Sequence, residues 1–483
     1  MPSKPEHPMN KAILRRGQFI KLMGAGAAAT VLPGLACTKD TGKRKPNIIF
    51  IMADDLGYGD LGSYGQTQIL TPNLDRMAAE GMRFTDHYAG STVCAPSRCC
   101  LMTGMHTGHA YVRGNRGMPG GGNLPLASGS ITVADILKDA GYATALVGKW
   151  GLGEPDTEGA PNLHGFDHYF GYTDQVHAHN YYPEFLWRNG EKVPLGNKVK
   201  RPENKPNSFG GVATVRVDYS HDLMADEALS FIESRKDGPF FLYLALTIPH
   251  ANNEAGAQGM EVPDDAPYTD ENWPQQQKNI AAMITRMDRD IGRLFDHLKH
   301  LGLDDDTIVF FTSDNGPHRE GGNDPDFFGS SGPLRGIKRD LYEGGIRVPM
   351  IVRWPGRIKA GAVSRHPSAF WDFLPTAAEL AGAKVPMSVD GISFVAALQG
   401  GTQKEHPYLY WEFKILQDFY QAARVGPWKA FRKRPDAPVE LYNLHQDSGE
   451  TVNLAESHPE VVAEMEVIFD EARETSEFWP QPS

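Results

Sequence analysis

The stretch Asn47-Ile48-Ile49-Phe50-Ile51-Met52-Ala53-Asp54-Asp55 decides the fold, because an unbroken apolar run ends there in two acidic residues. Such a run is typical of a strand that is buried on both faces of a sheet. Similar apolar runs predict further strands at residues 143–147, 240–248, 307–312 and 348–352. Helical apolar spacing and end signals predict helices at residues 71–81, 132–141 and 276–300. Strands that alternate with helices indicate an α/β fold with a large, mainly parallel sheet flanked by helices.

The pattern changes after about residue 395, so the chain is expected to have a smaller C-terminal part. Short mixed segments follow there, at residues 408–413, 421–425, 428–431 and 440–443. They indicate a small antiparallel sheet, and residues 458–474 indicate a closing helix. A chain of 483 residues is also too long for one small core. We therefore predict an α/β domain over residues 47–395 and a C-terminal α+β subdomain over residues 396–483.

Residues 1–37 have the composition of an export signal. Arg15 and Arg16 precede an apolar stretch of small residues that is shorter than the roughly 20 residues of a bilayer span. Two kinds of signal stay open. The arginine pair resembles a twin-arginine signal, and Cys37 stands where a bacterial lipoprotein would carry its membrane lipid anchor. Residues 38–46 would then form a tether, and the protein is expected in the periplasm or the cell envelope.

The formal net charge of −12 restricts the class of partner. Nucleic-acid binding needs a broad basic surface, so this charge argues against a nucleic-acid partner. An anionic substrate would have to be held by a few local cations and not by the field of the whole protein.

Cysteine is scarce and concentrated at one place. The chain has four, Cys37, Cys94, Cys99 and Cys100, of which three lie close together. Adjacent cysteines are poor disulfide partners on geometric grounds. A zinc site lacks the support of a CxxC pair.

Unusual polar residues follow four of the predicted strands. They are Asp54 and Asp55, Lys149, His250, and Asp314 with Asn315. In open α/β sheets, ligands bind beyond the carboxyl ends of the strands, so these side chains are expected to meet in one crevice. The carboxylates and the amide supply hard oxygen ligands, which suit Ca²⁺ or Mg²⁺ and not zinc.

The strongest local signal is Cys94-Ala95-Pro96-Ser97-Arg98, continued by Cys99-Cys100-Leu101-Met102-Thr103-Gly104. Proline and serine favour the first turn of a helix, so the segment predicts a helix start. The free N–H groups of such a start attract an anion, and Arg98 adds a fixed positive charge.

These residues resemble the type I sulfatase family of the alkaline-phosphatase-like superfamily. The Cys-x-Pro-Ser-Arg-x-x-Leu-x-Thr-Gly signature is complete at residues 94–104. Further agreement lies at residues 47–49, 54–60, 148–150, 313–316, 334–338 and 342–349. The resemblance covers most of residues 46–375 and implies that the α/β domain is the catalytic domain.

The resemblance also implies a mechanism. Cys94 would be oxidised to formylglycine by a formylglycine-generating or sulfatase-maturating enzyme. One oxygen of its hydrate would attack sulfur and displace the alcohol, giving a covalent sulfo-enzyme, and the second hydroxyl would then expel sulfate and regenerate the aldehyde. Asp54, Asp55, Asp314, Asn315 and residue 94 would hold the metal, with Ca²⁺ favoured over Mg²⁺. Arg98, Lys149 and Lys338 would contact sulfate or formylglycine, and His250 would be the general acid.

One position departs from the family pattern. The family commonly has a histidine two residues after the lysine of this strand, but here Lys149 is followed by Trp150 and Gly151. Three explanations stay open. Another histidine (His109, His177 or His179) takes its place, the step relies on Lys149 or water, or turnover is impaired.

The resemblance favours a sulfated carbohydrate as the substrate. His177 and His179 lie in a segment rich in groups that bind sugars, and His318 follows the Asp314-Asn315 pair. We take these three histidines as candidate substrate contacts. Two other functions stay open on the same scaffold, a phosphoester or phosphonate hydrolase and a non-catalytic protein that binds sulfated glycans.

Overall fold

The computed structural model describes residues 45–118, 122–203 and 208–480 of the chain. They belong to one compact unit, Arg44–Ser483. The predicted export signal at residues 1–37, with Cys37, and nearly all of the predicted tether lie outside the described residues. Among the helices of the described part, none combines the length and the apolar character that crossing a membrane requires.

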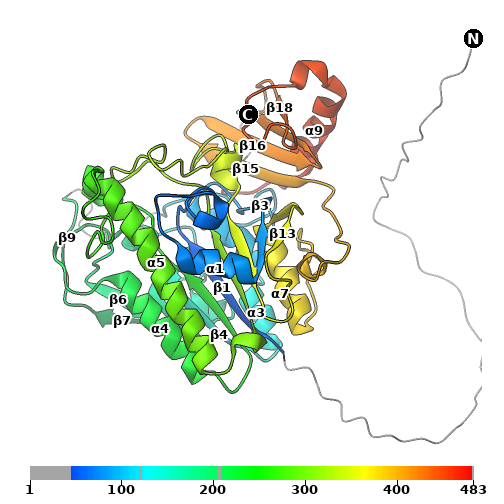
Figure 1. Cartoon of the computed structure of the whole chain (residues 1–483). Coiled ribbons are helices and arrows are strands. Elements are labelled where there is room, and N and C mark those ends of the chain that lie inside the picture. The colour runs from blue at the N-terminus through cyan, green and yellow to red at the C-terminus, as the bar shows by residue number, and fades with distance from the viewer. Residues whose placement is uncertain (1–44, 119–121, 204–207, 481–483) are drawn as a thin grey trace, which may run out of the picture. The chain divides into compact units, whose positions relative to one another are not determined.

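A ten-stranded sheet forms the centre of the large domain (Figure 1). Its spatial order is β13 (Ala362–Ser364), β2 (Met82–Phe84), β12 (Met350–Arg353), β11 (Thr307–Ser313), β1 (Asn47–Ala53), β10 (Phe240–Ala245), β4 (Ala143–Lys149), β5 (His168–Tyr172), β6 (Phe185–Arg188) and β7 (Glu191–Pro194). The five strands from β11 to β5 are parallel. Antiparallel pairs follow on either side of them. The predicted mixed, mainly parallel sheet is confirmed.

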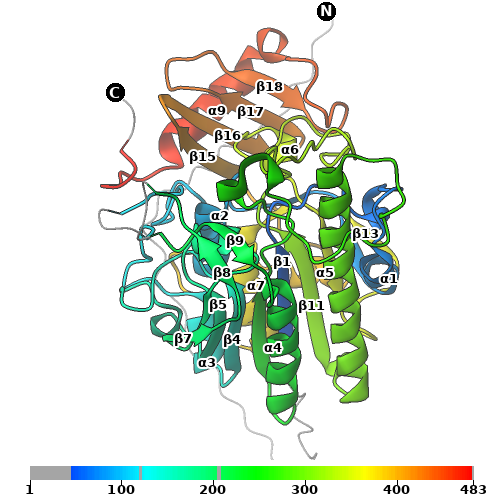
Figure 2. The same ribbon diagram turned by 90° about the vertical axis from the view of Figure 1, so that its left-hand side faces the viewer.

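Helices cover both faces of this sheet, as Figures 1 and 2 show. Alternate side chains of β1 point to opposite faces, with Phe50 in one apolar cluster and Ile51 in the other. The Phe50 cluster includes side chains of α2 (Cys94–Thr103), α3 (Val133–Asp139) and α7 (Phe373–Ala381). The Ile51 cluster includes side chains of α1 (Pro72–Glu80), α4 (Ser220–Ser234) and α5 (Gln275–His300). This burial on both faces explains why the β1 sequence is apolar without alternation.

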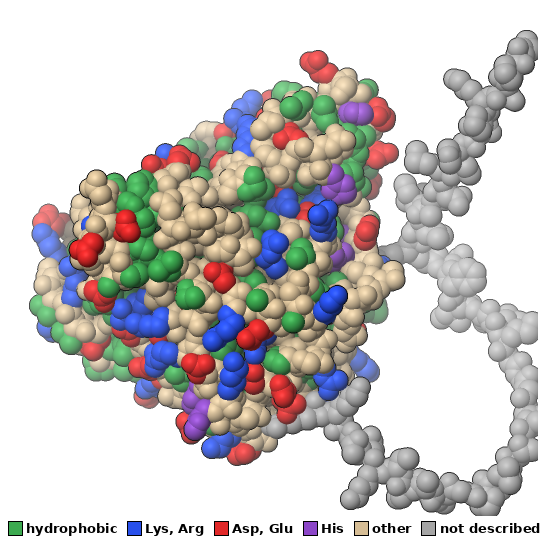
Figure 3. Space-filling model, viewed as in Figure 1, with side chains coloured by type: hydrophobic (Ala, Val, Ile, Leu, Met, Phe, Trp, Pro, Cys, Tyr) green, Lys and Arg blue, Asp and Glu red, His purple; other side chains and the backbone are tan. Residues whose placement is uncertain are grey.

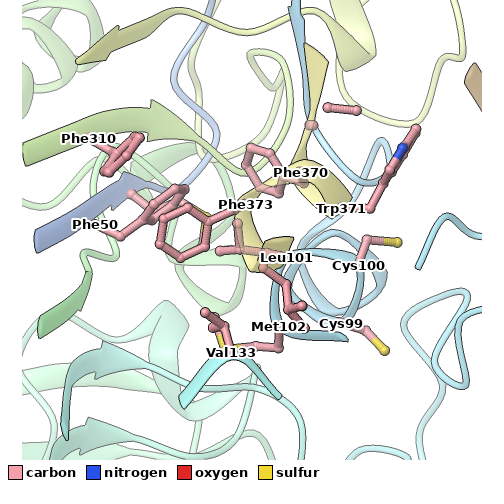
Figure 4. Packing of buried hydrophobic residues seen from close by; sticks show 14 of the residues in the cluster. Phe50, Cys99, Cys100, Leu101, Met102, Val133, Phe310, Phe370, Trp371 and Phe373 are labelled. Carbon is pink, nitrogen blue, oxygen red and sulfur yellow. The ribbon is translucent and has the colours of Figure 1, made fainter. Parts of the chain in front are cut away.

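Helix α2 is enclosed by this core along its whole length, since all ten of its residues are buried. In Figure 4 its Leu101 and Met102 lie beside Phe373, whose ring centroid is 4.3 Å from that of Phe50. Cys99 and Cys100 are free thiols within the same cluster. The helix that begins at Cys94 is therefore fixed by packing.

The C-terminal part is a four-stranded antiparallel sheet with one helix. Its strands are β15 (Leu409–Ile415), β16 (Asp418–Val425), β17 (Trp428–Arg432) and β18 (Glu440–Asn443), followed by α9 (Pro459–Glu471). The predicted antiparallel sheet and closing helix are confirmed. The boundary expected between residues 395 and 396 falls inside the short helix α8 (Val395–Leu398) and stays a prediction.

Buried charges link this small sheet to the large domain. Lys429 of β17 lies 2.9 Å from Glu343, which begins the short helix α6 (Glu343–Ile346), and 2.9 Å from Glu450. Arg424 of β16 pairs with Asp86 at 2.8 Å. Two small two-stranded sheets complete the strands, β14 (Ser368–Ala369) with β3 (His87–Tyr88) and β8 (Lys198–Lys200) with β9 (Val212–Val215).

On the face shown in Figure 3, the described Lys and Arg side chains are interspersed with Asp and Glu. The charge on this face is therefore mixed, and an anion needs a local arrangement of cations to be bound.

Candidate active site

The polar residues predicted from the strand ends meet at one edge of the sheet. Ala53 of β1 is paired in register with Ser313 of β11, so the residues that follow both strands lie side by side. The backbone N–H of Asp55 donates to Asp314 Oδ1 at 3.2 Å. The structure thus brings together groups that are 259 residues apart in the chain.

Each of the three carboxylates has its own cation. Lys149 Nζ lies 2.7 Å from Asp54 Oδ2, and Lys338 Nζ lies 2.7 Å from Asp55 Oδ2. Arg98 Nη2 lies 2.7 Å from Asp314 Oδ2, while its Nη1 donates to the carbonyl oxygen of Lys149 at 2.7 Å. All six side chains are buried, so these pairs interact with little screening by water.

Burial and charge act differently on the acids of this group. Burial raises the pKa of Asp54, but attraction to Lys149 and His250 outweighs it and holds the pKa well below its usual range. Burial raises the pKa of Asp314 to about 7, and repulsion from Asp54 adds to the rise. The three cations thus balance the three carboxylates in number, but repulsion between Asp54 and Asp314 persists, and a further cation bound between these two carboxylates would relieve it.

The residues of this cluster fit a hard divalent cation. Asn315 donates through Nδ2 to Asp55 Oδ1 at 2.7 Å, and its buried Oδ1 has no hydrogen-bond partner among the described residues. Ligand atoms of Asp54, Asp55, Cys94 and His250 lie within 4.8 Å of one another. Carboxylate oxygens and a free amide oxygen are the ligands that Ca²⁺ and Mg²⁺ prefer.

Cys94 lies at the first turn of α2, beside these carboxylates. Its Sγ is 3.4 Å from Asp54 Oδ1. The next amide, Ala95 N, donates to Asn115 Oδ1 at 3.1 Å, which satisfies one of the free N–H groups of the helix start. Burial raises the pKa of the Cys94 thiol to about 12, and the negative charge of Asp54 contributes.

A cavity of about 1210 Å³ opens over Cys94, and we call it the active-site pocket. His250 and Lys338 line it together with Cys94. His250 Nε2 lies 3.1 Å from Lys338 Nζ, and its Nδ1 lies 2.7 Å from the carbonyl oxygen of Ala251. Burial lowers the pKa of His250, and the adjacent Lys338 lowers it further. A neutral ring that donates through Nδ1 and accepts from Lys338 at Nε2 satisfies both contacts.

The three histidines expected to contact substrate differ in position. His179 lines the active-site pocket, stacks on His250 with ring centroids 4.9 Å apart and pairs with Glu254 at 3.1 Å. His177 is buried among aromatic rings, with its centroid 4.6 Å from that of Phe185. His318 is also buried, and its two ring nitrogens lie 3.1 Å from Pro249 O and 3.1 Å from Glu320 N.

Neither His177 nor His318 is among the residues that line the active-site pocket, so only His179 of the three lies on its surface. His109, the other histidine considered as a replacement at Gly151, lines a different cavity and pairs with Asp390 at 2.9 Å.

The structure adds pocket residues that sequence reasoning missed. Gln175 lines the pocket and occupies the space next to Gly151, where an added Cβ would lie 2.1 Å from Gln175 Nε2. The rings of Trp187 and Phe209 line another part of the pocket. Glu320 pairs with Lys338 at 3.3 Å. Trp187 lies in β6 and the other three residues lie in loops, where no motif or periodicity in the sequence marks them.

Comparison with known proteins identifies the family. Residues 46–383 match the family model described as Sulfatase. The chain belongs to the Sulfatase family. Residues 337–475 of this sulfatase also match the model described as N-sulphoglucosamine sulphohydrolase, C-terminal, which covers the small antiparallel sheet and α9. The predicted membership of the type I sulfatases, within the alkaline-phosphatase-like superfamily, is confirmed.

Named relatives are similar over nearly the whole chain. This sulfatase is 31% identical to N-acetylgalactosamine-6-O-sulfatase of Bacteroides thetaiotaomicron, over 92% of this chain and 98% of the relative. It is 34% identical to human arylsulfatase A, over 87% of this chain and 86% of the relative. Among solved structures, Ps i-CgsB in complex with k-i-k-neocarrahexaose is similar with a TM-score of 0.75 and 28% identity, covering 91% of this chain and 96% of that one. The protein is a sulfatase enzyme.

Proposed function

We propose that this sulfatase removes sulfate from a carbohydrate sulfate ester, with a nucleophile made from Cys94. One observation carries the proposal: Cys94 lies at the start of a buried helix, on the surface of a large pocket, beside three carboxylates and three cations. A sulfate group that enters this pocket meets fixed positive charges beside residue 94.

The proposal includes two groups that the residues of the cluster fit. When present, hydrated formylglycine at residue 94 supplies an oxygen nucleophile, and a divalent cation, for which we propose Ca²⁺, supplies positive charge to the sulfate oxygens. Asp54, Asp55, Asp314 and Asn315 would hold the cation, together with residue 94. A formylglycine-generating or sulfatase-maturating enzyme is the partner that this chemistry requires.

Residues of the chain itself bind and orient the sulfate. Lys149 and Lys338 orient Asp54 and Asp55 through their 2.7 Å ion pairs, and their charges favour sulfate nearby. Arg98 ties the first turns of α2 to Asp314 and to the end of β4. We assign to His250 the delivery of a proton to the leaving alcohol, with the Lys338 ammonium as its source: Nε2 accepts from Lys338 at 3.1 Å, and a proton passed to Nε2 can be given to the alcohol oxygen in the pocket.

A carbohydrate fits the rest of the pocket. Trp187 and Phe209 offer aromatic faces on which a sugar ring can stack, and Asn123, Glu154 and Asp174 offer groups that bond hydroxyls. Relatives whose names include N-acetylgalactosamine-6-O-sulfatase and a solved complex with a neocarrahexaose support the same substrate class. Export to the periplasm or cell envelope, with Cys37 as a lipid attachment site, is part of this proposal.

The test compares matched esters on protein coexpressed with a sulfatase-maturating enzyme. Conversion of Cys94 is followed by the mass of the peptide that contains it. We expect multiple turnovers on an aryl sulfate and on sulfated sugars, and much slower hydrolysis of the matched aryl phosphate. A preference for phosphate would overturn the assignment of sulfate, and binding of sulfated sugars without turnover would support a non-catalytic role instead.

A further inference from the structure

The side chain of Gln175 takes the space that a side chain at residue 151 would need. An added Cβ on Gly151 would lie 2.1 Å from Gln175 Nε2 and 2.9 Å from its Cδ. Real Cβ contacts are longer than 3.0 Å. Gly151 also has a φ of +73°, a conformation that favours glycine. Residue 151 therefore has no room for a side chain while Gln175 stands there.

The neighbouring backbone fixes Gln175 in this place. Gly151 N donates to the carbonyl oxygen of Thr173 at 3.1 Å, so the segment that leads into Gln175 runs beside the end of β4. On the other side, His177 N donates to Asp174 Oδ1 at 2.7 Å and closes a turn around Gln175. The backbone from which the Gln175 side chain extends is thus fixed on both sides, as positioning a substrate requires.

The carboxamide of Gln175 belongs to the active-site pocket. Gln175 is 5% exposed and lines the same cavity as Cys94 and His250. Its Nε2 reaches the carbonyl oxygen of Gly151 only at 3.4 Å, which is long for a hydrogen bond. A primary amide has two N–H donors, so one remains for a further acceptor in the pocket.

We propose that Gln175 is a further active-site residue, whose carboxamide donates a hydrogen bond to the sulfate group next to residue 94. The inference rests on the proposed function. Gly151 and Gln175 then form one feature, because the glycine makes room for a polar group that comes from another loop. This contact carries no charge and does not titrate, so its contribution is the same across the working pH range.

Gln175→Met is the direct test, because methionine keeps the length and most of the volume of glutamine but has no donor. We expect kcat on an aryl sulfate to fall by about tenfold to hundredfold, with a thermal midpoint close to that of the wild type. Gln399→Met is the matched control, since Gln399 is exposed at the end of α8 and the chemical change is the same. We expect this control to keep the wild-type kcat.

Two further variants keep the test decisive. Gln175→His introduces a titratable donor, so its pH profile should gain one ionisation beyond those of the wild type. If Gln175→Met does not fold, Gln175→Glu replaces it, and its negative charge should lower kcat/KM for the anionic substrate by at least about tenfold.

The outcomes separate this inference from the proposed function. The role of Gln175 would be overturned if the wild type turns over and Gln175→Met has an unchanged kcat, or if Gln175→Glu has an unchanged kcat/KM. Either result would leave the sulfatase proposal standing. Absence of sulfate-ester turnover in fully converted wild-type protein would overturn the proposed function, and the role of Gln175 with it.

Discussion

Replacing Lys429 with methionine tests what holds the C-terminal sheet on the catalytic domain. The ammonium of Lys429 lies 2.9 Å from Glu343 Oε1 and 2.9 Å from Glu450 Oε1, and all three side chains are fully buried. Removing the cation leaves Glu450 buried without its basic partner, beside Glu343, which keeps its ion pair with Arg347 at 3.2 Å. Breaking a buried ion pair in this way costs about 3–5 kcal/mol, so we expect the free energy of unfolding to fall by that amount.

The loss should depend on pH in a defined direction. Burial raises the pKa of Glu450 to about 7 although Lys429 lies beside it, and the pKa rises further when Lys429 is removed. The folded variant then binds a proton that the unfolded chain releases at lower pH. A raised carboxyl pKa in the folded state makes the free energy of unfolding fall as the pH rises. The difference in free energy of unfolding between the wild type and Lys429→Met should therefore be larger near about pH 8 than near about pH 5.

Urea unfolding followed by tryptophan fluorescence at the two pH values measures the effect. Lys414→Met is the matched control, because Lys414 is an exposed residue of β15 in the same sheet, and its replacement should change stability little. A loss below about 1 kcal/mol at the higher pH, or a greater loss at the lower pH, would refute the role assigned to the buried cluster.

Three other perturbations have clear expected outcomes. Gly151→Ala should lower the free energy of unfolding by about 1–3 kcal/mol, because residue 151 has a φ of +73° and the new methyl group meets Gln175. The double variant Gly151→Ala/Gln175→Ala should regain part of that loss, as measured by the thermal midpoint. A Gly151→Ala variant as stable as the wild type would contradict this. Burial raises the pKa of Asp60 to about 7, so ionisation of this residue should contribute a fall in thermal midpoint as the pH rises from about 4 to about 7. Asp60→Asn should flatten that fall in thermal midpoint, and an unchanged pH slope would contradict the assignment. Removing divalent cations with a chelator should abolish turnover and lower the thermal midpoint, and adding Ca²⁺ should restore both. Full activity in protein that elemental analysis shows to be metal-free would contradict the metal proposal.

The centre of the sheet could be predicted because its strands are buried on both faces. Residues 47–53 form a continuous apolar run, and such runs have few alternatives to a central strand. The edge strands could not be predicted in the same way. β7 is four residues long and mostly exposed, so its sequence has neither a long apolar run nor clear alternation. β12 was expected from its apolar residues, but its antiparallel pairing with β11 depends on the path of the loop before it.

The metal cluster could be predicted because parallel strands bring their carboxyl ends together. Asp54 and Asp314 each follow a central strand, so the register of the sheet alone makes them neighbours. His177 shows the limit of this reasoning. Its place in a polar segment suggested a substrate contact, but tertiary packing encloses it beside Phe185 and Tyr172.

Gln175 could not be found from the sequence because its position depends on two loops at once. Nothing in the sequence near Gln175 signals a catalytic role, and Gly151 alone indicates only that a side chain is absent. The relation between them becomes visible only when β4 and β5 are aligned side by side, so that the residues after both strands meet.

In the proposed function, turnover depends on a nucleophile made from Cys94. The most direct measurement is the rate of sulfate release from an aryl sulfate as a function of the fraction of Cys94 converted to the aldehyde, in preparations with different amounts of the maturation enzyme. We predict a rate proportional to that fraction and no turnover by Cys94→Ala. A rate that is independent of conversion, or turnover that persists in Cys94→Ala, would rule out residue 94 as the source of the nucleophile.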